Sequence, residues 1–363
     1  MRVAFDHQIF SLQRYGGIAR YFFEIGERLA RRTDTRIGVI APVHLNHYLD
    51  RARGMQVLGL RVPAVPKIRR AIIGMNDLLS GAAMKAWAPD IVHETYYGHG
   101  TAPRRARSVI TIHDMIPERL PHLFEEGGAL ARAKAEAVRR ADHVICVSES
   151  TKRDLLDILG VSVERVSVVH HASPFAQQER GESRRPPPGE PFILYVGQRF
   201  GYKNFERLLA AYASSPRVHA AFRLVCFGGE RADDDRRRAQ RAGVPERVLF
   251  AGGDDAALAS LYDTASAFVY PSLYEGFGIP LLEAMSFGCP VICSNTSSVP
   301  EVAGDAAEFF DPSDTCSIAS AIERVLFAPE RSTELARKGR SRARAFSWEI
   351  AADRTRAVYA SLL

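Results

Sequence analysis

The feature that most constrains the fold is an alternation of short β-branched runs with longer segments of helical periodicity. Residues 2–5 (RVAF) form the first such run, and residues 17–32 follow with apolar side chains at helical spacing, as do residues 129–140. Further strand-like runs lie at 36–41, 90–94, 108–114, 143–148, 192–197, 222–228, 247–252, 267–272 and 290–295. This alternation predicts an α/β fold of parallel, doubly wound sheets with helices on both faces.

A polar, proline-rich stretch divides the runs into two sets. Residues 177–191 (QQERGESRRPPPGEP) are typical of an exposed linker, and 363 residues exceed the usual size of one hydrophobic core. We therefore expect two Rossmann-like domains, over residues 1–183 and 190–346. The last helical pattern, at about 347–363, is expected to pack back onto the first domain. The natural ligand site is a cleft between facing sheets, beyond the carboxyl ends of the strands.

The charge of the chain is unevenly distributed. The formal net charge of +6 is concentrated before residue 185, which favours an acidic partner surface. The stretch 61–73 (RVPAVPKIRRAII) interleaves bases with apolar residues. It fits a solvated connector and, equally well, a segment that contacts anionic lipid headgroups or a lipid-phosphate acceptor. We expect no nucleic-acid partner.

The N-terminal segment and the apolar runs bear on localisation. Asp6 and His7 interrupt the apolar run that a cleavable signal peptide needs. The apolar runs are strand-sized, shorter than the ~20 residues that span a bilayer. We expect a cytoplasmic protein, with a possible peripheral location on the inner face of the cytoplasmic membrane.

Glycines follow the first strand-like run. Gly16 and Gly17 precede a helical pattern, where backbone N–H groups and the helix dipole favour an anion. The spacing is not the G-x-G-x-x-G dinucleotide fingerprint, which argues against a nicotinamide dehydrogenase.

Charged and titratable side chains follow two later runs. Arg199 and Lys203 leave the end of the run at 192–197, four residues apart, and both can reach one diphosphate. The alternative is a pair of exposed surface cations. His113 and Asp114 end the run at 108–114. A neutral imidazole there can hydrogen-bond a sugar hydroxyl or a leaving group, with Asp114 setting its tautomer or contacting the acceptor. A structural hydrogen-bonded pair is the alternative.

Two glutamates flank a glycine-containing loop in YEGFGIPLLEAM. Pro280 suits the first turn of a helix and Gly288 its end, so we expect a short helix over 280–287. Glu283 then lies in or just after the first turn, and Glu275 lies in the loop before it. Acids near a helix N-terminus stabilise its dipole by roughly 0.3–1 kcal/mol each, which explains Glu283 but not the preceding Gly-Phe-Gly.

Acidic clusters elsewhere resemble metal ligands only superficially. Asp233, Asp234 and Asp235 run directly into three arginines, which is typical of a solvated helix face. Asp254 and Asp255 have no further partner pattern. We expect no cofactor and no requirement for a divalent metal.

The segment from Tyr270 to Ile292, followed by SSVPE at 297–301, resembles the signature of family-4 glycosyltransferases. The resemblance covers nearly the whole chain, including Gly16-Gly17, His113-Asp114, the VSES sequence at 147–150, and Arg199 with Lys203. It implies a retaining, nucleotide-sugar-dependent enzyme of the GT-B fold, in which two Rossmann-like domains face each other across a cleft.

The resemblance also implies residue roles. Catalytic positions would be His113, Asp114, Glu275, Arg199 and Lys203. Donor-binding positions would be Gly16 and Gly17 at the diphosphate, Arg199 and Lys203 neutralising it, Phe250, Ala251 and Gly252 near the base, Glu275 at the sugar hydroxyls, Gly276, Phe277, Gly278, Ile279, Pro280 and Leu281 in the intervening loop, and Glu283 at the ribose. Two like-charged glutamates suit vicinal hydroxyls rather than phosphates.

The N-terminal stretch FDHQIFSLQRYGGIARYF is similar to those of mannosyl- and related transferases of O-antigen assembly. We therefore expect GDP-mannose or a related GDP-sugar as donor, with a UDP-sugar next, and a lipid-linked or oligosaccharide acceptor in surface polysaccharide synthesis. Alternatives are a GT-B-like sugar-nucleotide epimerase and a non-catalytic nucleotide- or carbohydrate-binding protein.

Overall fold

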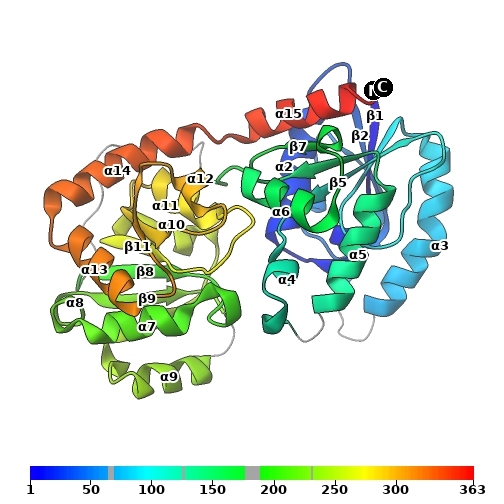
Figure 1. Cartoon of the computed structure of the whole chain (residues 1–363). Coiled ribbons are helices and arrows are strands. Elements are labelled where there is room, and N and C mark those ends of the chain that lie inside the picture. The colour runs from blue at the N-terminus through cyan, green and yellow to red at the C-terminus, as the bar shows by residue number, and fades with distance from the viewer. Residues whose placement is uncertain (64–68, 125–126, 176–188, 230–231) are drawn as a thin grey trace. The chain divides into compact units, whose positions relative to one another are not determined.

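The computed structural model describes the chain except for residues 64–68, 125–126, 176–188 and 230–231 (Figure 1). The chain divides into two compact units. The first contains Met1–His171 and Trp348–Leu363, and the second contains Ala172–Ser347. The expected linker midpoint, near residue 185, lies outside the described residues.

The first unit is built on a seven-stranded sheet in the order β3-β2-β1-β4-β5-β6-β7, with every neighbouring pair parallel. Its strands are β1 (Arg2–Asp6), β2 (Arg36–His44), β3 (Gln56–Arg61), β4 (Ile91–Glu94), β5 (Arg107–Ile112), β6 (His143–Cys146) and β7 (Val166–Val168). Its helices are α1 (Gln8–Leu12), α2 (Gly17–Ala30), η1 (Leu49–Arg51), α3 (Arg69–Trp87), α4 (Ile116–Arg119), η2 (Pro121–Leu123), α5 (Gly127–Arg140), α6 (Glu149–Leu159), η3 (Val163–Arg165) and α15 (Trp348–Ala360).

Helices cover both faces of this sheet (Figure 1). Because side chains alternate along a strand, Ile110 and Ile112 pack with Ala137 of α5 on one face, while Thr111 between them points to the other. That other face receives α2 and α15. Tyr21 of α2 hydrogen-bonds Thr111 at 3.3 Å. The last helix of the chain therefore belongs to the first unit.

The second unit is built on a six-stranded parallel sheet in the order β10-β9-β8-β11-β12-β13. Its strands are β8 (Phe192–Val196), β9 (Arg223–Phe227), β10 (Val248–Ala251), β11 (Ala267–Tyr270), β12 (Val291–Ser294) and β13 (Ala307–Phe310). Its helices are η4 (Gly201–Lys203), α7 (Phe205–Ser214), α8 (Pro216–Ala221), α9 (Ala232–Arg241), η5 (Pro245–Arg247), α10 (Asp255–Thr264), α11 (Ile279–Ser286), α12 (Val299–Ala303), α13 (Thr315–Leu326) and α14 (Pro329–Arg344).

The same alternation builds the core of the second unit. Ala267 and Val269 of β11 face the cluster formed with α7 and α13, whereas Phe268 packs edge-on against Tyr262 of α10 at 5.6 Å. The predicted doubly wound α/β architecture is therefore confirmed in both units.

Three strands were not predicted, namely β3, β7 and β13. Each lies at an edge of its sheet. The expected strands each have a described counterpart within a few residues of the predicted bounds. In the described part of the chain, no helix is long and apolar enough to cross a membrane.

Candidate functional site

The glycine loop before α11 has the local geometry that its sequence predicts. The helix begins one residue earlier than expected, at Ile279, with Pro280 in its first turn. Gly278 precedes it at φ 101° and Gly288 follows it at φ 66°, conformations that side-chain-bearing residues rarely adopt. The glycines at these two positions therefore set where the loop turns into the helix and where the helix stops.

Glu275 is held in this loop by several contacts. Lys203 Nζ donates to Glu275 Oε1 at 2.7 Å, and the Glu275 amide donates to Ser297 Oγ at 2.9 Å. Ser298 Oγ in turn donates to the carbonyl oxygens of Glu275 and Phe277, at 2.9 and 3.0 Å. Glu275 is only 7% exposed, so its carboxylate has a defined orientation.

Lys203 ends η4, directly after β8. Its ammonium lies 5.6 Å from the centre of the Tyr270 ring and 5.1 Å from that of Tyr202. The next residue, Asn204, has a left-handed backbone and donates through its amide to the carbonyls of Pro271 and Pro312. The turn that carries Lys203 is thereby tied to the end of β11, within reach of Glu275.

Glu283 lies in α11 and is 8% exposed. The Tyr262 hydroxyl of α10 donates to Glu283 Oε2 at 3.0 Å. Burial, followed by the nearby Glu283 carboxylate, raises the pKa of Tyr262 well above its usual value. Tyr262 therefore stays protonated and remains a donor to this glutamate.

Arg199 is buried rather than displayed at the surface. It is 4% exposed, and its Nε donates to Asp235 Oδ2 of α9 at 2.5 Å. Its Nη1 donates to the Gly228 carbonyl, and its guanidinium lies 5.1 Å from the centre of the Phe250 ring at the end of β10. The guanidinium is therefore oriented by three strand ends and one helix.

The interpretation of residues 233–235 as a solvated helix face is wrong for Asp235, which is 1% exposed. Asp234 fits the prediction, because its side chain is 44% exposed and pairs with Arg237. Asp235 is buried because α9 turns it inward beside Ala239, one helical turn later, which is 1% exposed. The i, i+4 pairing with a small apolar residue is the signal that could have revealed this.

The structure gives Arg199 and Lys203 different partners, so neither is the exposed surface cation of the alternative interpretation. Gly229, at φ 79°, follows the carbonyl that holds Arg199. A Cβ there would lie 2.7 Å from Arg199 Nη2. Glycine at 229 thus leaves room beside the guanidinium. Ala251 contacts the same segment, because its carbonyl oxygen accepts a hydrogen bond from the Gly228 amide at 3.0 Å. Gly252 is exposed.

His113 follows β5 in the first unit and lies against a second imidazole. Its Nδ1 is 3.4 Å from His171 Nε2, and the two rings stack with centres 5.5 Å apart. Burial, followed by His171, holds the pKa of His113 well below its usual range, so the ring is neutral. His113 Nε2 is buried without a hydrogen-bond partner among the described residues.

Asp114 does not set the tautomer of His113, because the imidazole faces His171. Instead Asp114 Oδ1 accepts the Ile116 amide at 3.1 Å, which starts α4. The buried Lys134 of α5 donates to the Asp114 carbonyl at 2.8 Å and to Glu118 at 2.9 Å. The contact between Lys134 and Asp114 was not predicted from the sequence, because the two residues lie 20 positions apart.

Gly16 and Gly17 differ in their surroundings. Gly16 precedes α2 in extended backbone, and a Cβ there would lie 2.2 Å from Gln13 Oε1. That Gln13 oxygen accepts the Ala19 amide at 3.3 Å, so this side chain caps the helix. Gly17 has open space where a Cβ would stand.

The acidic residues outside these loops have structural partners. Asp254 accepts the Ala257 amide and caps α10. Among the residues that the structure describes, no group of three His, Cys, Asp or Glu side chains is arranged to hold a metal ion.

Three buried histidines make the stability of the first unit depend on pH. Burial lowers the pKa of His93 and of His171 to about 3, and that of His113 as well. The unfolded chain takes up these protons near pH 6.5 whereas the fold does not, so acidification from about 6.5 toward 3 lowers the unfolding free energy. Each histidine contributes up to about 1.4 kcal/mol per pH unit. Glu94, whose pKa burial raises to about 7, acts in the opposite direction between about 4.5 and 7.

We expect His171→Asn to reduce this slope by about 1.4 kcal/mol per pH unit between pH 6 and 4.5, because one such histidine is removed. Both tryptophans, Trp87 and Trp348, lie in the first unit, so urea unfolding followed by tryptophan fluorescence measures that unit. An identical pH slope for the variant and the wild type would contradict the assignment of His171 as a buried neutral imidazole.

Comparisons with known proteins converge on one family. The model described as Glycosyltransferase Family 4 matches residues 15–173, and that described as Glycosyl transferases group 1 matches residues 177–342. O-antigen chain mannosyltransferase B of Escherichia coli is 30% identical over 289 residues, which cover 75% of each chain. A glycogen synthase of Mycobacterium tuberculosis is 28% identical over 291 residues, covering 76% of this chain and 69% of that one.

Among solved structures, a sucrose-phosphate synthase from Thermosynechococcus elongatus superposes with a TM-score of 0.76. The match covers 99% of this chain and 98% of that chain, at 21% identity. It shows that the two chains share a fold.

Proposed function

The chain belongs to glycosyltransferase family 4, has the GT-B fold and is a hexosyltransferase, and from this premise we propose its substrates and mechanism. It transfers a hexose or deoxyhexose from a nucleotide sugar to a hydroxyl of a lipid-linked or oligosaccharide acceptor in surface polysaccharide synthesis. The observation that carries the proposal is the contact between Lys203 and Glu275, which orients this glutamate in the glycine loop before α11. The similarity to an O-antigen mannosyltransferase favours GDP-mannose or a related GDP-sugar, with a UDP-sugar next.

In this proposal the glutamates bind hydroxyls. Glu275 accepts from Lys203 through one oxygen and also forms a side-chain hydrogen bond with Tyr270, and the remaining lone pairs of its carboxylate can accept from the transferred sugar. Glu283, oriented by Tyr262, accepts from the ribose. The Lys203 ammonium has three donors, so it can hold Glu275 and a donor phosphate together. The acids thus select the sugar and cations bind the phosphates.

Charge on the leaving diphosphate is stabilised by Arg199 and Lys203. Arg199 is held by Asp235 and the Gly228 carbonyl, so its orientation is established before the donor binds. The bond between the anomeric carbon and the phosphate oxygen breaks, and the acceptor oxygen bonds to the same face of the sugar. The acceptor proton passes to the departing phosphate, and the configuration is retained.

His113 lies beside the reacting sugar in this proposal. Because its pKa is lowered, its ring is neutral at physiological pH. If His171 accepts from His113 Nδ1–H, the partnerless Nε2 carries a lone pair that can accept from a sugar hydroxyl. No metal takes part in the proposed step.

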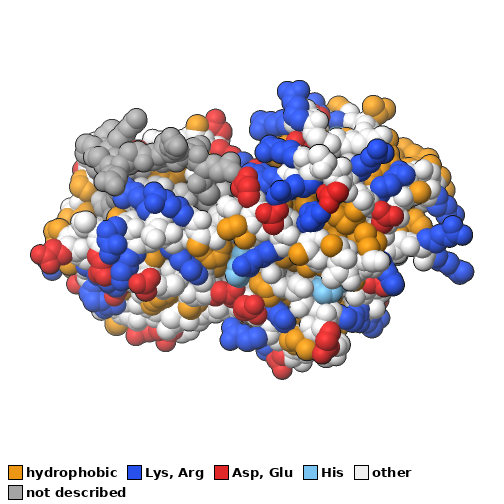
Figure 2. Space-filling view, turned by 90° about the horizontal axis from the view of Figure 1, so that it is seen from above, with side chains coloured by type: hydrophobic (Ala, Val, Ile, Leu, Met, Phe, Trp, Pro, Cys, Tyr) orange, Lys and Arg blue, Asp and Glu red, His pale blue; other side chains and the backbone are white. Residues whose placement is uncertain are grey.

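We also propose peripheral binding to an anionic membrane through the first unit. Figure 2 shows Lys and Arg side chains beside hydrophobic patches on the face of this unit in view. Leu60 and Leu78 are 76% and 80% exposed. Such a mixture of bases and exposed apolar side chains is typical of surfaces that bind anionic lipid headgroups. Co-sedimentation with vesicles that contain anionic lipids tests this placement.

Calorimetry with GDP, UDP, ADP and dTDP, each with and without EDTA, tests the donor. We expect GDP to bind tightest, with an affinity unchanged by EDTA, because the phosphates are bound by Arg199 and Lys203. NMR of the product made from an α-linked donor should show an α-linkage. Preference for UDP, loss of binding with EDTA, or a β-linked product would each contradict the corresponding part of the proposal.

A further inference from the structure

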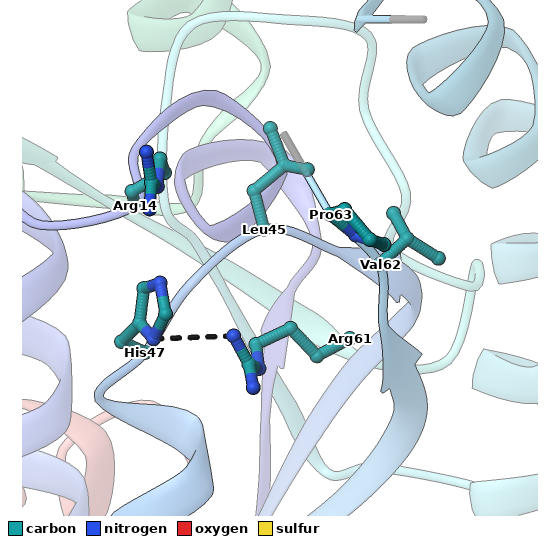
Figure 3. Close-up of a pocket in the computed structure, with 6 residues that line it drawn as sticks. All are labelled: Arg14, Leu45, His47, Arg61, Val62 and Pro63. Carbon is teal, nitrogen blue, oxygen red and sulfur yellow. Dashed lines mark hydrogen bonds between the residues drawn. The ribbon is translucent and has the colours of Figure 1, made fainter. Parts of the chain in front are cut away.

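A hollow of about 410 Å³ lies in the first unit (Figure 3). Three segments line it. They are the loop between α1 and α2, the segment after β2 and the end of β3, with lining residues Arg14, Leu45, His47, Arg61, Val62 and Pro63. Its volume is within the range of small-ligand sites, roughly 300–1,000 Å³.

One side of the hollow is cationic. The Arg14 side chain is exposed and makes no hydrogen bond or ion pair with the described residues. Arg61 Nη1 donates to His47 Nδ1 at 3.2 Å, and Arg61 Nε lies 2.9 Å from Asp50 Oδ2. Tyr15 stacks on the His47 imidazole at 4.7 Å and limits its rotation.

The charges around the hollow favour an anion. Asp50 is the acid paired with Arg61. The charge of Arg14 has no acidic partner among the described residues. Burial lowers the pKa of the neighbouring His44, so that ring adds no charge. Two guanidinium groups beside one hollow match the planar, bidentate geometry with which arginine binds phosphate.

The other side of the hollow is apolar. Leu45, Val62 and Pro63 lie opposite Arg14 and His47 in Figure 3. Leu60, in the edge strand β3, is 76% exposed and lies two residues before Val62. Exposed apolar side chains therefore lie next to the cationic end of the hollow.

We propose that this hollow binds the phosphate group of an amphiphile, a phosphate or diphosphate joined to an apolar chain. This rests on the proposed function, in which such a molecule carries the acceptor sugar. Arg14 lies two residues before Gly16, which the family resemblance places at the donor diphosphate. A phosphate on Arg14 and Arg61 would therefore anchor the acceptor beside the loop that is expected to approach the donor diphosphate.

The test is calorimetry with dodecyl phosphate below its micelle concentration, compared with inorganic phosphate and octyl glucoside. We expect dodecyl phosphate to bind best, since it alone fills both sides of the hollow. R14Q and R61Q should each weaken it about tenfold, the effect of one charge-assisted contact. Val62→Ser should weaken dodecyl phosphate and leave inorganic phosphate unchanged.

Arg31→Gln is the matched control, because Arg31 is an exposed arginine at the other end of α2. It should change the Kd for dodecyl phosphate less than twofold. Wild-type affinity in R14Q and R61Q would overturn the site. Equal affinity for inorganic phosphate and dodecyl phosphate would overturn the proposal that the ligand is an amphiphile. Competition by GDP or UDP would assign the hollow to the donor and overturn the proposal.

Vesicles provide the membrane arm. Phosphatidylcholine vesicles that contain phosphatidic acid, a phosphomonoester, should sediment more protein than those with phosphatidylglycerol, and R14Q should remove that difference. If both kinds of anionic vesicle sediment the same amount of protein, the hollow does not recognise the phosphomonoester headgroup. If neither sediments more protein than phosphatidylcholine vesicles alone, the proposed peripheral binding is overturned. Failure of transfer with every nucleotide sugar would overturn the proposed function, whereas amphiphile binding is measured without turnover.

Discussion

Glu275→Ala is expected to lower kcat/KM for donor turnover by about 10- to 150-fold. A hydrogen bond to a charged group contributes about 1.5–3 kcal/mol, and in the proposed complex Glu275 accepts from the transferred sugar. The substitution also leaves the Lys203 ammonium, whose side chain is 18% exposed, without its ion-pair partner. Release of nucleoside diphosphate measures the effect, and circular dichroism confirms that the variant is folded.

Two further variants make the result interpretable. Glu275→Gln keeps the shape of the side chain but loses its charge, so we expect an intermediate loss. Glu330→Ala removes an exposed glutamate from the first turn of α14 and should stay within about twofold of wild type. Turnover of Glu275→Ala at the wild-type level would refute the role assigned to this residue.

Asp235→Ala is expected to give the largest loss of stability, about 3–5 kcal/mol in the second unit. Asp235 and Arg199 form a pair in which both side chains are almost fully buried, with 2% and 4% exposure. Removal of the acid leaves a buried guanidinium uncompensated, which costs far more than loss of a surface pair. The unfolding temperature of this unit should fall by roughly 6–20 °C, measured by scanning calorimetry.

Asp234→Ala is the matched control for Asp235→Ala. Asp234 is the adjacent residue, and its carboxylate pairs with Arg237 at the surface. Surface pairs contribute about 0–1 kcal/mol, so its unfolding temperature should hardly change. The double variant Arg199→Ala/Asp235→Ala should lose less than the sum of the two single variants, since no unpaired charge remains. Equal unfolding temperatures for Asp235→Ala and Asp234→Ala would show that the pair is not buried in solution.

Most of the strands that the sequence predicts have two covered faces, although the edge strand β10 was predicted as well. Residues 192–196 of β8 and 267–270 of β11 lie inside their sheet, and such strands need nearly continuous apolar runs. β3 could not be found in this way, because it is an edge strand whose last three residues are exposed. β7 and β13 have only three and four residues and lie at edges as well.

The positions of the candidate site residues were predictable because glycine and proline restrict the backbone locally. Gly278 and Gly288 bound α11 in the structure as their positive φ angles require. The partners of the charged residues were not predictable in this way. Asp235, the buried partner of Arg199, lies 36 residues away on a helix whose sequence is mostly charged.

The amino-acid sequence was sufficient for the fold class, the existence of the central strands and the loops that carry the candidate site, because periodicity and backbone restriction are local properties. Only the tertiary structure decided what each charged group contacts. Lys203 meets Glu275 across 72 residues, and His113 meets His171, not the adjacent Asp114, across 58. Such pairs form where strand ends converge at one edge of a sheet, a proximity that depends on packing and is absent from any local pattern.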